Sequence, residues 1–500
     1  MPLFKTRSIL ILVIMLISCR PNEKKEINRA VYTPDWESLS AHNQSPRWFQ
    51  DAKFGIYFHW GVYSVPAFDS EWYPRNMHFP GKTMEHHIQH YGPPGEFGYH
   101  DFVPMFKAEN FNAGEWAALF KKAGARFAGP VAEHHDGFSM WDSDVTPWNA
   151  MDKGPHKDIL GELVTAFRAQ GMKLVTTFHH ARNLQRYSDN PDEREFANSH
   201  YPLFEGMPPT FNDPELNMLY GNVEEDRWIE EVWLGKLKEV IKKYHPDIIW
   251  FDSWLDLIPE EKQLEFCAYY LNEAAKNDQE VVIVRKQDDL PLTVSINDLE
   301  KSRMNQIGDQ CWMTDETISK GSWCYTEDLE IKDTRDLLHV LIDIVSKNGV
   351  LMLNISPKAD GTIPENQKEV LLGIGRWLDQ YGEAIYGTRP WHTFGEGPTR
   401  EPEGHFKHHE EFLKIVYSSE DIRYTTKDNI IYALILGWPE GKNEVVFNAF
   451  KDQELSVNAV SLLGSDQSIS WTVADSGLQV SLPGEKVNDM AIVYKIEISK

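Results

Sequence analysis

The sequence predicts an α/β protein: a (β/α)8-like barrel of the TIM type, with one helix irregular or missing, followed by an antiparallel β-sandwich. Apolar runs alternate with amphipathic helical segments over the first 390 residues, a pattern typical of a parallel sheet. At least five of these apolar runs have a polar residue at their C-terminal end. A closed barrel gathers such ends around one pocket, whereas an open sheet uses chiefly one crevice.

The first 30 residues are predicted to be a signal peptide and a tether. A positively charged start precedes the apolar run 9–17, which is too short to cross a bilayer. The run ends in Leu-Ile-Ser before Cys19, which resembles a bacterial lipobox, so residues 1–18 would be removed and Cys19 lipidated. An ordinary secretory signal with a chance cysteine is the alternative. Residues 19–30 would tether a lipid-anchored protein of the bacterial periplasm or cell surface.

Residues 31–390 are predicted to form the barrel. Apolar runs predict its strands at residues 53–59, 126–133, 173–179, 247–252, 281–285 and 350–355. Helical spacing of apolar residues predicts helices at 113–123, 158–170, 224–244, 333–346 and 365–381. No strand is followed by a glycine-rich phosphate loop, which argues against a nucleotide-binding sheet.

Residues 391–500 are predicted to form the β-sandwich. The helical pattern ends here, and short runs separated by turn residues are typical of antiparallel strands. We expect these strands at residues 412–417, 430–436, 444–448, 469–473, 478–482 and 489–498.

The net charge and the cysteines limit the binding partners, disulfides and metal sites that the chain can have. The formal net charge is −26, and an acidic surface repels phosphate backbones, so no nucleic acid partner is expected. Besides Cys19, the chain has Cys267, Cys311 and Cys324, which allow at most one disulfide, with Cys311–Cys324 as an unforced option. No pair has C-x-x-C spacing, so no thiolate metal site is indicated.

Two adjacent histidines, His134 and His135, give the strongest functional signal. They stand between Glu133 and Asp136, directly after an apolar run. Each imidazole needs its own hydrogen-bond partner. Because neighbours on a strand point to opposite faces, both rings can turn toward a ligand only at a strand end. The pair therefore predicts a polar pocket at the mouth of the parallel sheet.

Carboxylates meet aromatic rings at two further places. Asp252 ends an apolar run between Trp250 and Trp254, and a desolvated carboxylate of this kind can attack an anomeric carbon. A helix cap is the alternative use of Asp252. Glu71 and Trp72 repeat the pairing in a loop, where a carboxylate is usually only solvated.

His59 and Trp60 close the first predicted strand and place a hydrogen-bonding ring beside an aromatic plate. A lone histidine at a strand end is often structural, and a metal site is the other alternative. Barrel metallohydrolases commonly begin with His-x-His on the first strand, whereas this chain offers only His59 there and has no H-E-x-x-H. We therefore expect no metal and no other cofactor.

Together these motifs make the chain similar to the α-L-fucosidases of glycoside hydrolase family 29. The similarity extends over about residues 31–390 and is carried by residues 48–49, 53–55, 59–61, 71–73, 133–138, 250–252, 348–355 and 386–391. It implies a retaining exo-α-L-fucosidase that releases terminal L-fucose from fucosylated oligosaccharides or glycoconjugates by double displacement.

The resemblance implies that Asp252 is the nucleophile. It also implies that the sugar site is lined by His59, Glu71, Trp72, His134, His135 and Trp250. The chemistry agrees, because fucose offers hydroxyls for imidazoles and carboxylates and a methyl group for aromatic rings. The residues at strand ends add three expected contacts: Trp60, His179 and Arg285.

The general acid/base is the second carboxylate, which a retaining mechanism needs about 5–5.5 Å from the first. Its sequence position shifts between subgroups of the family. Glu300 is favoured because it follows the strand that ends at Arg285, where family members tend to place it; Glu316 and Glu71 are the alternates. Residues 178–180 read Phe-His-His, where many relatives carry tyrosines.

Two other functions are compatible with parts of this pattern. A catalytically weak glycan-binding lipoprotein would keep the histidines and tryptophans but lack one carboxylate, whereas Asp252 is present. A metal-dependent barrel hydrolase would lose its activity on exhaustive chelation.

Overall fold

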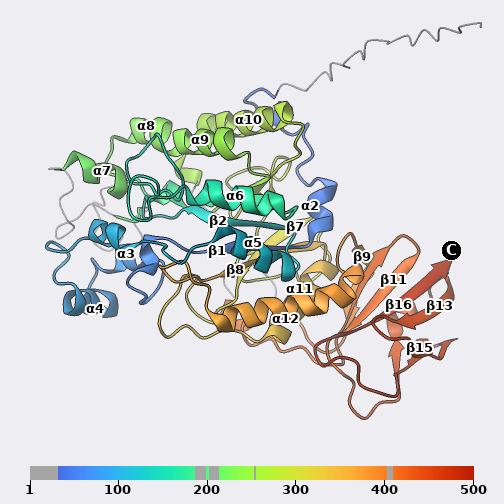
Figure 1. Cartoon of the computed structure of the whole chain (residues 1–500). Coiled ribbons are helices and arrows are strands. Elements are labelled where there is room, and N and C mark those ends of the chain that lie inside the picture. The colour runs from blue at the N-terminus through green and yellow to red at the C-terminus, as the bar shows by residue number, and fades with distance from the viewer. Residues whose placement is uncertain (1–31, 186–198, 202–212, 253–254, 403–408, 500) are drawn as a thin grey trace, which may run out of the picture.

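A computed structural model describes residues 32–185, 199–201, 213–252, 255–402 and 409–499. Eight parallel strands form the first part in the order β6-β5-β4-β3-β2-β1-β8-β7 (Figure 1). A parallel bridge between Asp298 and Met313 joins β6 to β7, so the sheet closes into the predicted barrel. The strands are β1 (Phe54–Phe58), β2 (Phe127–Glu133), β3 (Lys173–Phe178), β4 (Ile248–Phe251), β5 (Val282–Arg285), β6 (Ile296–Asn297), β7 (Trp312–Thr317) and β8 (Gly349–Ile355).

Helices alternate with most of the strands. The long ones are α5 (Ala113–Lys122), α6 (Ile159–Ala169), α9 (Gly235–Tyr244), α10 (Glu260–Lys276), α11 (Thr334–Ser346) and α12 (Glu365–Tyr381). The helix predicted at 224–244 is present as α8 (Glu225–Arg227), a π-helical turn (Trp228–Leu234) and α9. The short helices are α1 (Trp36–Leu39), α2 (Arg47–Ala52), α3 (Tyr73–Asn76), α4 (Lys82–His90), α7 (Pro214–Tyr220) and α13 (His409–Phe412).

One side of the barrel has no helical cover. Residues 286–311 are all described, and they contain only β6 and no helix. The barrel is therefore irregular between β5 and β7, in the way that the sequence prediction allowed.

Side chains alternate along the strands between the barrel interior and the helical layer. In β1, Ile56 and Phe58 pack in the outer layer, whereas Tyr57 lies inside the barrel. In β4, Trp250 lies inside and Phe251 outside. Whether the first polar residue after a strand points into the barrel mouth is set by this alternation.

A register shift in β2 brings both predicted histidines to the mouth. The pairing of β2 with β3 is irregular between Val131 and Glu133. Glu133 turns outward and forms a fully buried ion pair at 2.7 Å with Lys236 of α9. His134 and His135 then follow at the strand end, which agrees with the prediction from their sequence.

The second part of the chain consists of two antiparallel sheets around a common apolar core. One has the order β13-β16-β11-β10-β9 and the other β12-β15-β14. The strands are β9 (Arg389–Glu396), β10 (Ile422–Lys427), β11 (Ile430–Ile435), β12 (Glu444–Phe447), β13 (Ser456–Leu462), β14 (Trp471–Ala474), β15 (Gly477–Ser481) and β16 (Ile492–Ser499). β9 runs across the boundary predicted at residue 390.

One predicted strand of this part is not formed. Residues 412–417 contain the end of α13 and no strand. Phe412 and Tyr417 are instead buried beside the Arg303 guanidinium, at 5.0 and 6.0 Å from their ring centres. Phe412 and Tyr417 thus dock on the barrel, whereas Leu413 and Val416 of the same run are exposed.

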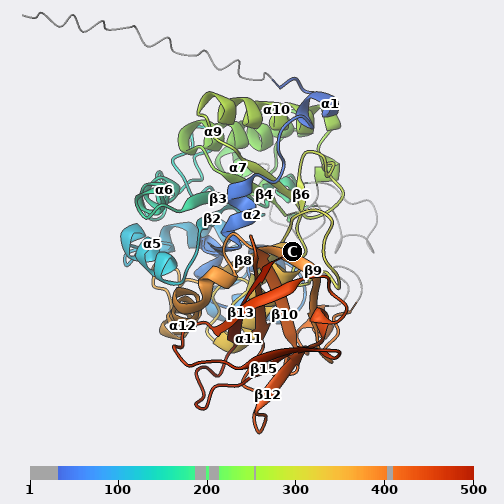
Figure 2. The same cartoon turned by 90° about the vertical axis from the view of Figure 1, so that its right-hand side faces the viewer.

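The sandwich packs against α11 of the barrel through β9 and β10 (Figure 2). A buried cluster of charges fastens the two parts together there. Asp343 of α11 pairs with Arg423 of β10 at 2.7 Å and with Lys347 at 2.8 Å. Glu401 completes the cluster at 3.0 Å from Lys347, and all four side chains are at most 3% exposed. Such a cluster is stable only while every charge keeps its partner.

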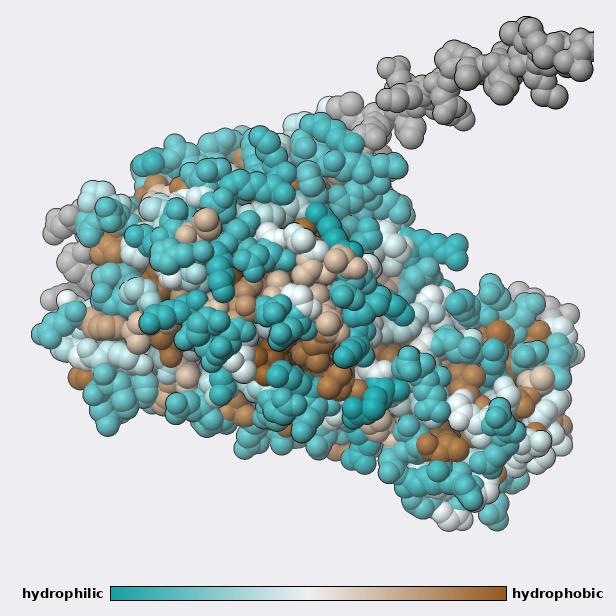
Figure 3. Space-filling view, viewed as in Figure 1, coloured by the Kyte–Doolittle hydropathy of each residue, from teal (hydrophilic) through white to brown (hydrophobic). Residues whose placement is uncertain are grey.

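The face of the molecule in Figure 3 is mostly hydrophilic and carries scattered apolar patches. None of the described helices is long and apolar enough to cross a membrane. Cys267, Cys311 and Cys324 are buried free thiols, so the optional Cys311–Cys324 disulfide is absent. The predicted signal peptide, Cys19 and the tether lie outside the described residues.

Candidate active site

A pocket of about 230 Å³ opens where the barrel strands end. This volume is below the roughly 300–1,000 Å³ of sites for drug-sized ligands, so the pocket fits one small ring. It is lined by His59, Glu71, Trp72, His134, His135, His179, Arg182, Trp250, Asp252, Lys286, Gln287, Glu300, Asp315 and Trp323. The set includes both carboxylates that the sequence favoured.

Asp252 directly follows β4 and is 15% exposed. Its Oδ1 lies 2.6 Å from Lys286 Nζ, and its Oδ2 lies 3.2 Å from both His135 Nε2 and His179 Nδ1. Burial by itself would raise the pKa of Asp252, but these neighbours, Lys286 foremost, hold that pKa well below its usual range. Asp252 is therefore an ionised carboxylate at neutral pH.

Lys286 joins the two carboxylates. Its Nζ also lies 2.8 Å from Glu300 Oε2. With contacts of 2.6 and 2.8 Å, the nearest oxygens of Asp252 and Glu300 are at most about 5.4 Å apart, in agreement with the spacing of about 5–5.5 Å in retaining glycosidases. Burial would lower the pKa of Lys286, but Asp252 and Glu300 raise it well above its usual value.

His59 is held by Asn354 of β8. The Asn354 amide nitrogen donates to Thr317 Oγ1 at 3.0 Å and to the Trp323 carbonyl oxygen at 2.8 Å, which turns its oxygen toward His59. That oxygen is 2.9 Å from both the backbone nitrogen and Nδ1 of His59. Nδ1 therefore carries the proton, and Nε2 is the bare acceptor.

His135 and His179 orient each other around Asp252. His135 Nδ1 lies 2.6 Å from the backbone carbonyl oxygen of His179, to which it donates. Burial lowers the pKa of His135 to about 4, although the hydrogen bond with Asp252 partly offsets it. Burial and the neighbouring His135 also hold the pKa of His134 well below its usual value. His134 is therefore a neutral imidazole, which can both donate and accept hydrogen bonds, whereas His135 faces two acceptors, the His179 carbonyl oxygen and Asp252.

Three tryptophans supply the apolar part of the pocket. Trp323 lies against His59, with ring centres 5.4 Å apart, and Trp250 lies 5.3 Å from His179. Trp72 packs 5.0 Å from His135. Flat apolar rings beside hydrogen-bonding groups suit a ligand with one apolar and one polar side.

Three further carboxyl groups lie in or beside the pocket. Glu71 Oε2 accepts hydrogen bonds from the Trp323 backbone nitrogen and from Ser322 Oγ, both at 3.2 Å, and burial raises the pKa of Glu71. Asp315 accepts from Tyr57 Oη at 2.8 Å. Burial and the neighbouring Asp315 hold the pKa of Asp298 well above its usual range, so these two share a proton.

Three predicted residues are not brought to the pocket. Trp60 packs among aromatic rings of the helical layer. Arg285 forms an ion pair with Asp288 at 3.0 Å outside the barrel wall, and Glu316 pairs with Lys332 at 2.7 Å. Because side chains alternate along a strand, the pocket receives the adjacent residues instead: His59, Lys286 and Asp315.

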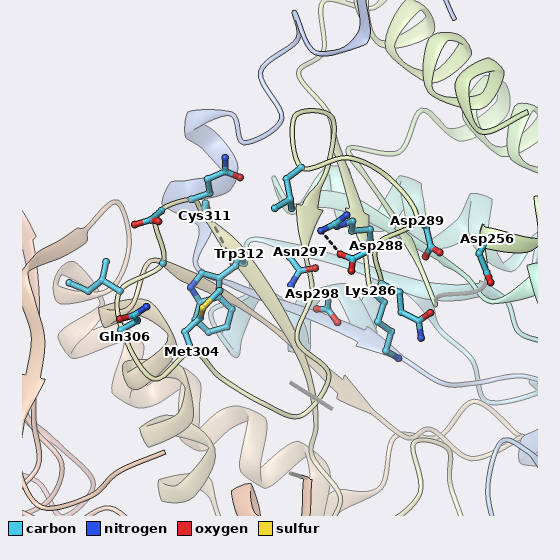
Figure 4. Close-up of a pocket in the computed structure, with 17 residues that line it drawn as sticks. Asp256, Lys286, Asp288, Asp289, Asn297, Asp298, Met304, Gln306, Cys311 and Trp312 are labelled. Carbon is cyan, nitrogen blue, oxygen red and sulfur yellow. Dashed lines mark hydrogen bonds and ion pairs between the residues drawn. The ribbon is translucent and has the colours of Figure 1, made fainter. Parts of the chain in front are cut away.

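A larger cavity of about 1110 Å³ lies against the uncovered wall of β5, β6 and β7 (Figure 4). Asp288 and Asp289 stand near one end, and Met304, Gln306 and Cys311 near the other (Figure 4). It shares Lys286 and Gln287 with the smaller pocket. It contains none of the pocket histidines and neither Asp252 nor Glu300, so the chemistry belongs to the smaller pocket.

The sequence prediction missed five residues that line the pocket: Arg182, Lys286, Gln287, Asp315 and Trp323. Lys286 could not be separated from Arg285, because the fifth strand is buried on both faces and gives no phase for the alternation. Asp315 lies on β7, which is too polar to be recognised as a strand. Arg182, Gln287 and Trp323 lie outside the strands and give no periodic signal.

Comparisons with known proteins agree with this arrangement. The family model "Alpha-L-fucosidase" matches residues 19–383, and "Alpha-L-fucosidase C-terminal domain" matches residues 417–498. Tissue alpha-L-fucosidase of Rattus norvegicus is 33% identical over 464 residues, which cover 90% of this chain and 88% of that protein. The Homo sapiens tissue enzyme is 30% identical over 482 residues and covers 95% of this chain and 92% of its own length.

Solved structures show the same likeness. The crystal structure of Thermotoga maritima alpha-fucosidase superposes with a TM-score of 0.73 at 29% identity, over 93% of this chain and all of that one. Further structures of that enzyme hold fucose or a mechanism-based inhibitor. The barrel, the pocket at its mouth and both family matches lead to one conclusion: the chain belongs to the α-L-fucosidases of glycoside hydrolase family 29.

Proposed function

We propose that this chain is a retaining exo-α-L-fucosidase that releases terminal L-fucose from fucosylated glycans. The observation that carries the proposal is the pair of carboxylates, Asp252 and Glu300, which one ammonium group holds within about 5.4 Å of each other. The small pocket favours a terminal sugar over an internal one. Its imidazoles suit the hydroxyls of fucose, and its tryptophans suit the methyl group.

In the first step, a carboxylate oxygen of Asp252 attacks C1 of fucose. The bond from C1 to the leaving oxygen breaks, and that oxygen takes the proton of Glu300. The product is a fucosyl ester of Asp252 and a released glycan. The low pKa of Asp252 keeps the nucleophile ionised at the moment of attack.

In the second step, water attacks C1 and gives a proton to Glu300, and Asp252 leaves as a carboxylate. Two inversions at C1 give net retention. While Asp252 is esterified, its charge is gone, and Lys286 keeps its ion pair with Glu300. Lys286 thus keeps Glu300 at the position from which it accepts the proton of water.

Azide tests the two assignments separately. Asp252→Ala should lower hydrolysis of an aryl α-L-fucoside by about 10⁴-fold or more. Azide should restore turnover and give the inverted β-fucosyl azide, because it replaces the missing nucleophile. Asp256→Ala, at an exposed neighbouring carboxylate, is the matched control and should keep full activity. Turnover by Asp252→Ala without azide would contradict the assignment.

The acid/base is tested in the same way. With Glu300→Ala, azide should attack the fucosyl ester and give the retained α-fucosyl azide, because no base is needed for an anion. Glu71→Ala is the comparison, since Glu71 is the other carboxyl in the pocket with a raised pKa. If azide accelerates Glu71→Ala but not Glu300→Ala, Glu71 is the acid/base.

We also propose that Cys19 carries lipid and anchors the enzyme in the bacterial periplasm or at the cell surface. The lipobox-like sequence before Cys19 supports this. In a bacterial host, Cys19→Ala should move the activity from the membrane fraction to the soluble fraction. Cys324→Ala, which leaves the lipobox intact, is the control, and unchanged fractionation of Cys19→Ala would contradict the proposal.

A further inference from the structure

Three imidazoles converge in the pocket at metal-ligand spacing. One ring nitrogen from each of His59, His134 and His179 lies within 4.8 Å of the other two. Each side chain is buried to the same degree, at 3% exposure. They come from the ends of β1, β2 and β3, which are adjacent in the barrel, so a stable scaffold holds them.

The free nitrogens of these rings are available as ligands. His59 Nδ1 is bonded to Asn354, which leaves Nε2 bare. His179 Nδ1 faces Asp252, and its Nε2 is buried without a hydrogen-bond partner among the described residues. His134 Nδ1 is buried and also has no hydrogen-bond partner there. Buried polar atoms are normally satisfied, so these orphaned nitrogens point to a ligand.

We propose that His59, His134 and His179 bind one divalent transition-metal ion of the zinc class, and that this ion and fucose exclude each other. Three neutral imidazoles with an open fourth position form a common zinc site.

The ion would be an inhibitor rather than a cofactor. It would occupy the nitrogens that the proposed function assigns to the sugar hydroxyls. It would also attract the Asp252 carboxylate, which lies 3.2 Å from His179, and so weaken the nucleophile. Copper should bind more tightly than zinc, and magnesium and calcium should not bind, because they prefer oxygen ligands. The exclusion of fucose rests on the proposed function; the metal site itself does not.

Other histidines of the chain must be controlled for. His86 and His90 lie one turn apart on α4, with ring centres 4.2 Å apart, and form a surface pair that can take a metal. The sequence also has His405, His408 and His409 close together. Replacing His86 and His90 by Gln, and separately the other three by Gln, removes these competitors without touching the pocket.

The test uses the full chain, stripped with a chelator and desalted. Zinc titrated calorimetrically should bind in a one-to-one ratio, and saturating L-fucose should weaken that binding at least tenfold. Cobalt in place of zinc should give the visible absorption of a tetrahedral site. Zinc should raise KM for an aryl fucoside with little change in kcat, and chelation should reverse the effect.

Variants decide where the ion sits. His179→Gln and His59→Gln, checked for folding by circular dichroism, should each lose the cobalt band and bind zinc at least tenfold more weakly. The two control variants should keep both signals. A cobalt band that survives in His179→Gln and His59→Gln, or vanishes in a control variant, overturns the metal site. A protein that binds cobalt in the pocket but hydrolyses no fucoside refutes the proposed function alone.

Discussion

The Lys286 ammonium dominates the electrostatics of the pocket at the scale of single residues. It lies within 2.8 Å of both Asp252 and Glu300, and a third carboxyl, Asp315, lines the same pocket. Without it, two carboxylates within about 5.4 Å of each other would repel, and one of them would ionise only at higher pH. Lys286 is thus a positioning residue that also sets the charge state of the nucleophile.

Replacing Lys286 should change the pH profile as well as the rate. We expect Lys286→Met to lower kcat/KM about 10²–10³-fold, similar to the loss of other preorganised charges. Because Lys286 lowers the pKa of Asp252, its removal raises that pKa, and the acidic limb of the kcat/KM profile moves to higher pH. Lys286→Arg keeps the charge and should keep the limb near its original position. An unshifted limb in Lys286→Met would contradict this role.

Asp136 gives a second pH effect, on stability. Tyr99 Oη donates to it at 2.5 Å, but burial raises the pKa of Asp136 to about 7. The folded state therefore binds more protons than the unfolded state, whose pKa is about 3.9, and stability falls as the pH rises from about 4 to about 7. We expect Asp136→Asn, which mimics the protonated form, to remove this fall. Thermal midpoints of both proteins at pH 5 and 7.5 measure it.

The sequence predicted much of the pocket, and its errors have one physical cause. His134, His135 and Asp252 were identified because polar residues after apolar runs mark strand ends. Arg285 was chosen over Lys286 because the fifth strand is apolar on both faces, as buried parallel strands are, and so gives no phase for the alternation. Only the three-dimensional closure of the barrel decides which of two neighbours faces the mouth.

At the scale of elements, β2 depends on a glycine. A side-chain carbon at Gly129 would lie 1.6 Å from the backbone oxygen of Val175 in β3. The two strands can approach here only because Gly129 has no side chain, and the same strand pair shifts register further on, between Val131 and Glu133, just before His134 and His135.

Gly129→Ala should therefore disrupt the barrel between β2 and β3. A backbone clash cannot be relieved by a rotamer change, so we expect a loss of about 3 kcal/mol or more in the free energy of unfolding, or insoluble protein. Gly321→Ala is the matched control, because no atom lies within 4 Å of its added carbon. Equal thermal midpoints for the two variants would contradict the importance of this contact.

Elements were predicted unevenly. Five of the barrel's long helices have clear apolar periodicity, and six of its strands are recognisable as apolar runs. β7 was not predicted as a strand because it contains the polar residues 314–317, although all of its residues are buried. β6 was not predicted because a strand of two residues gives no pattern in the sequence. Tertiary partners, such as Lys332 for Glu316, make these polar strands possible and are invisible in local sequence.

At the scale of the whole molecule, the buried charges between barrel and sandwich control cooperativity. Burial would raise the pKa of Asp343, but Lys347, Arg423 and Arg303 lower it. Its contribution to stability is thus present above the unfolded pKa of about 3.9 and is lost as the pH falls below it.

Removing Asp343 should weaken the junction strongly. Asp343→Ala leaves Lys347 and Arg423 with Glu401 alone, and breaking a buried ion pair costs about 3–5 kcal/mol. By calorimetry we expect a lower midpoint and a separation of barrel and sandwich into two transitions. Asp336→Ala, at an exposed position of the same helix, should leave the transition unchanged. A single unshifted transition in Asp343→Ala would contradict this account.

The barrel is weakly closed along one side, from β5 through β6 to β7. On one side of the pocket, β1, β2 and β3 pair over several residues, whereas β5 and β6 pair over two, and β6 meets β7 at a single bridge. Among the barrel strands, the backbone amide hydrogens of β5 and β6 should therefore exchange with solvent fastest. The pocket histidines and Asp252 follow the well-paired strands β1 to β4, whereas Lys286 and Glu300 lie where β5 and β6 are weakly paired. On warming, the protein should therefore lose hydrolysis of a fucoside at a lower temperature than it loses binding of fucose.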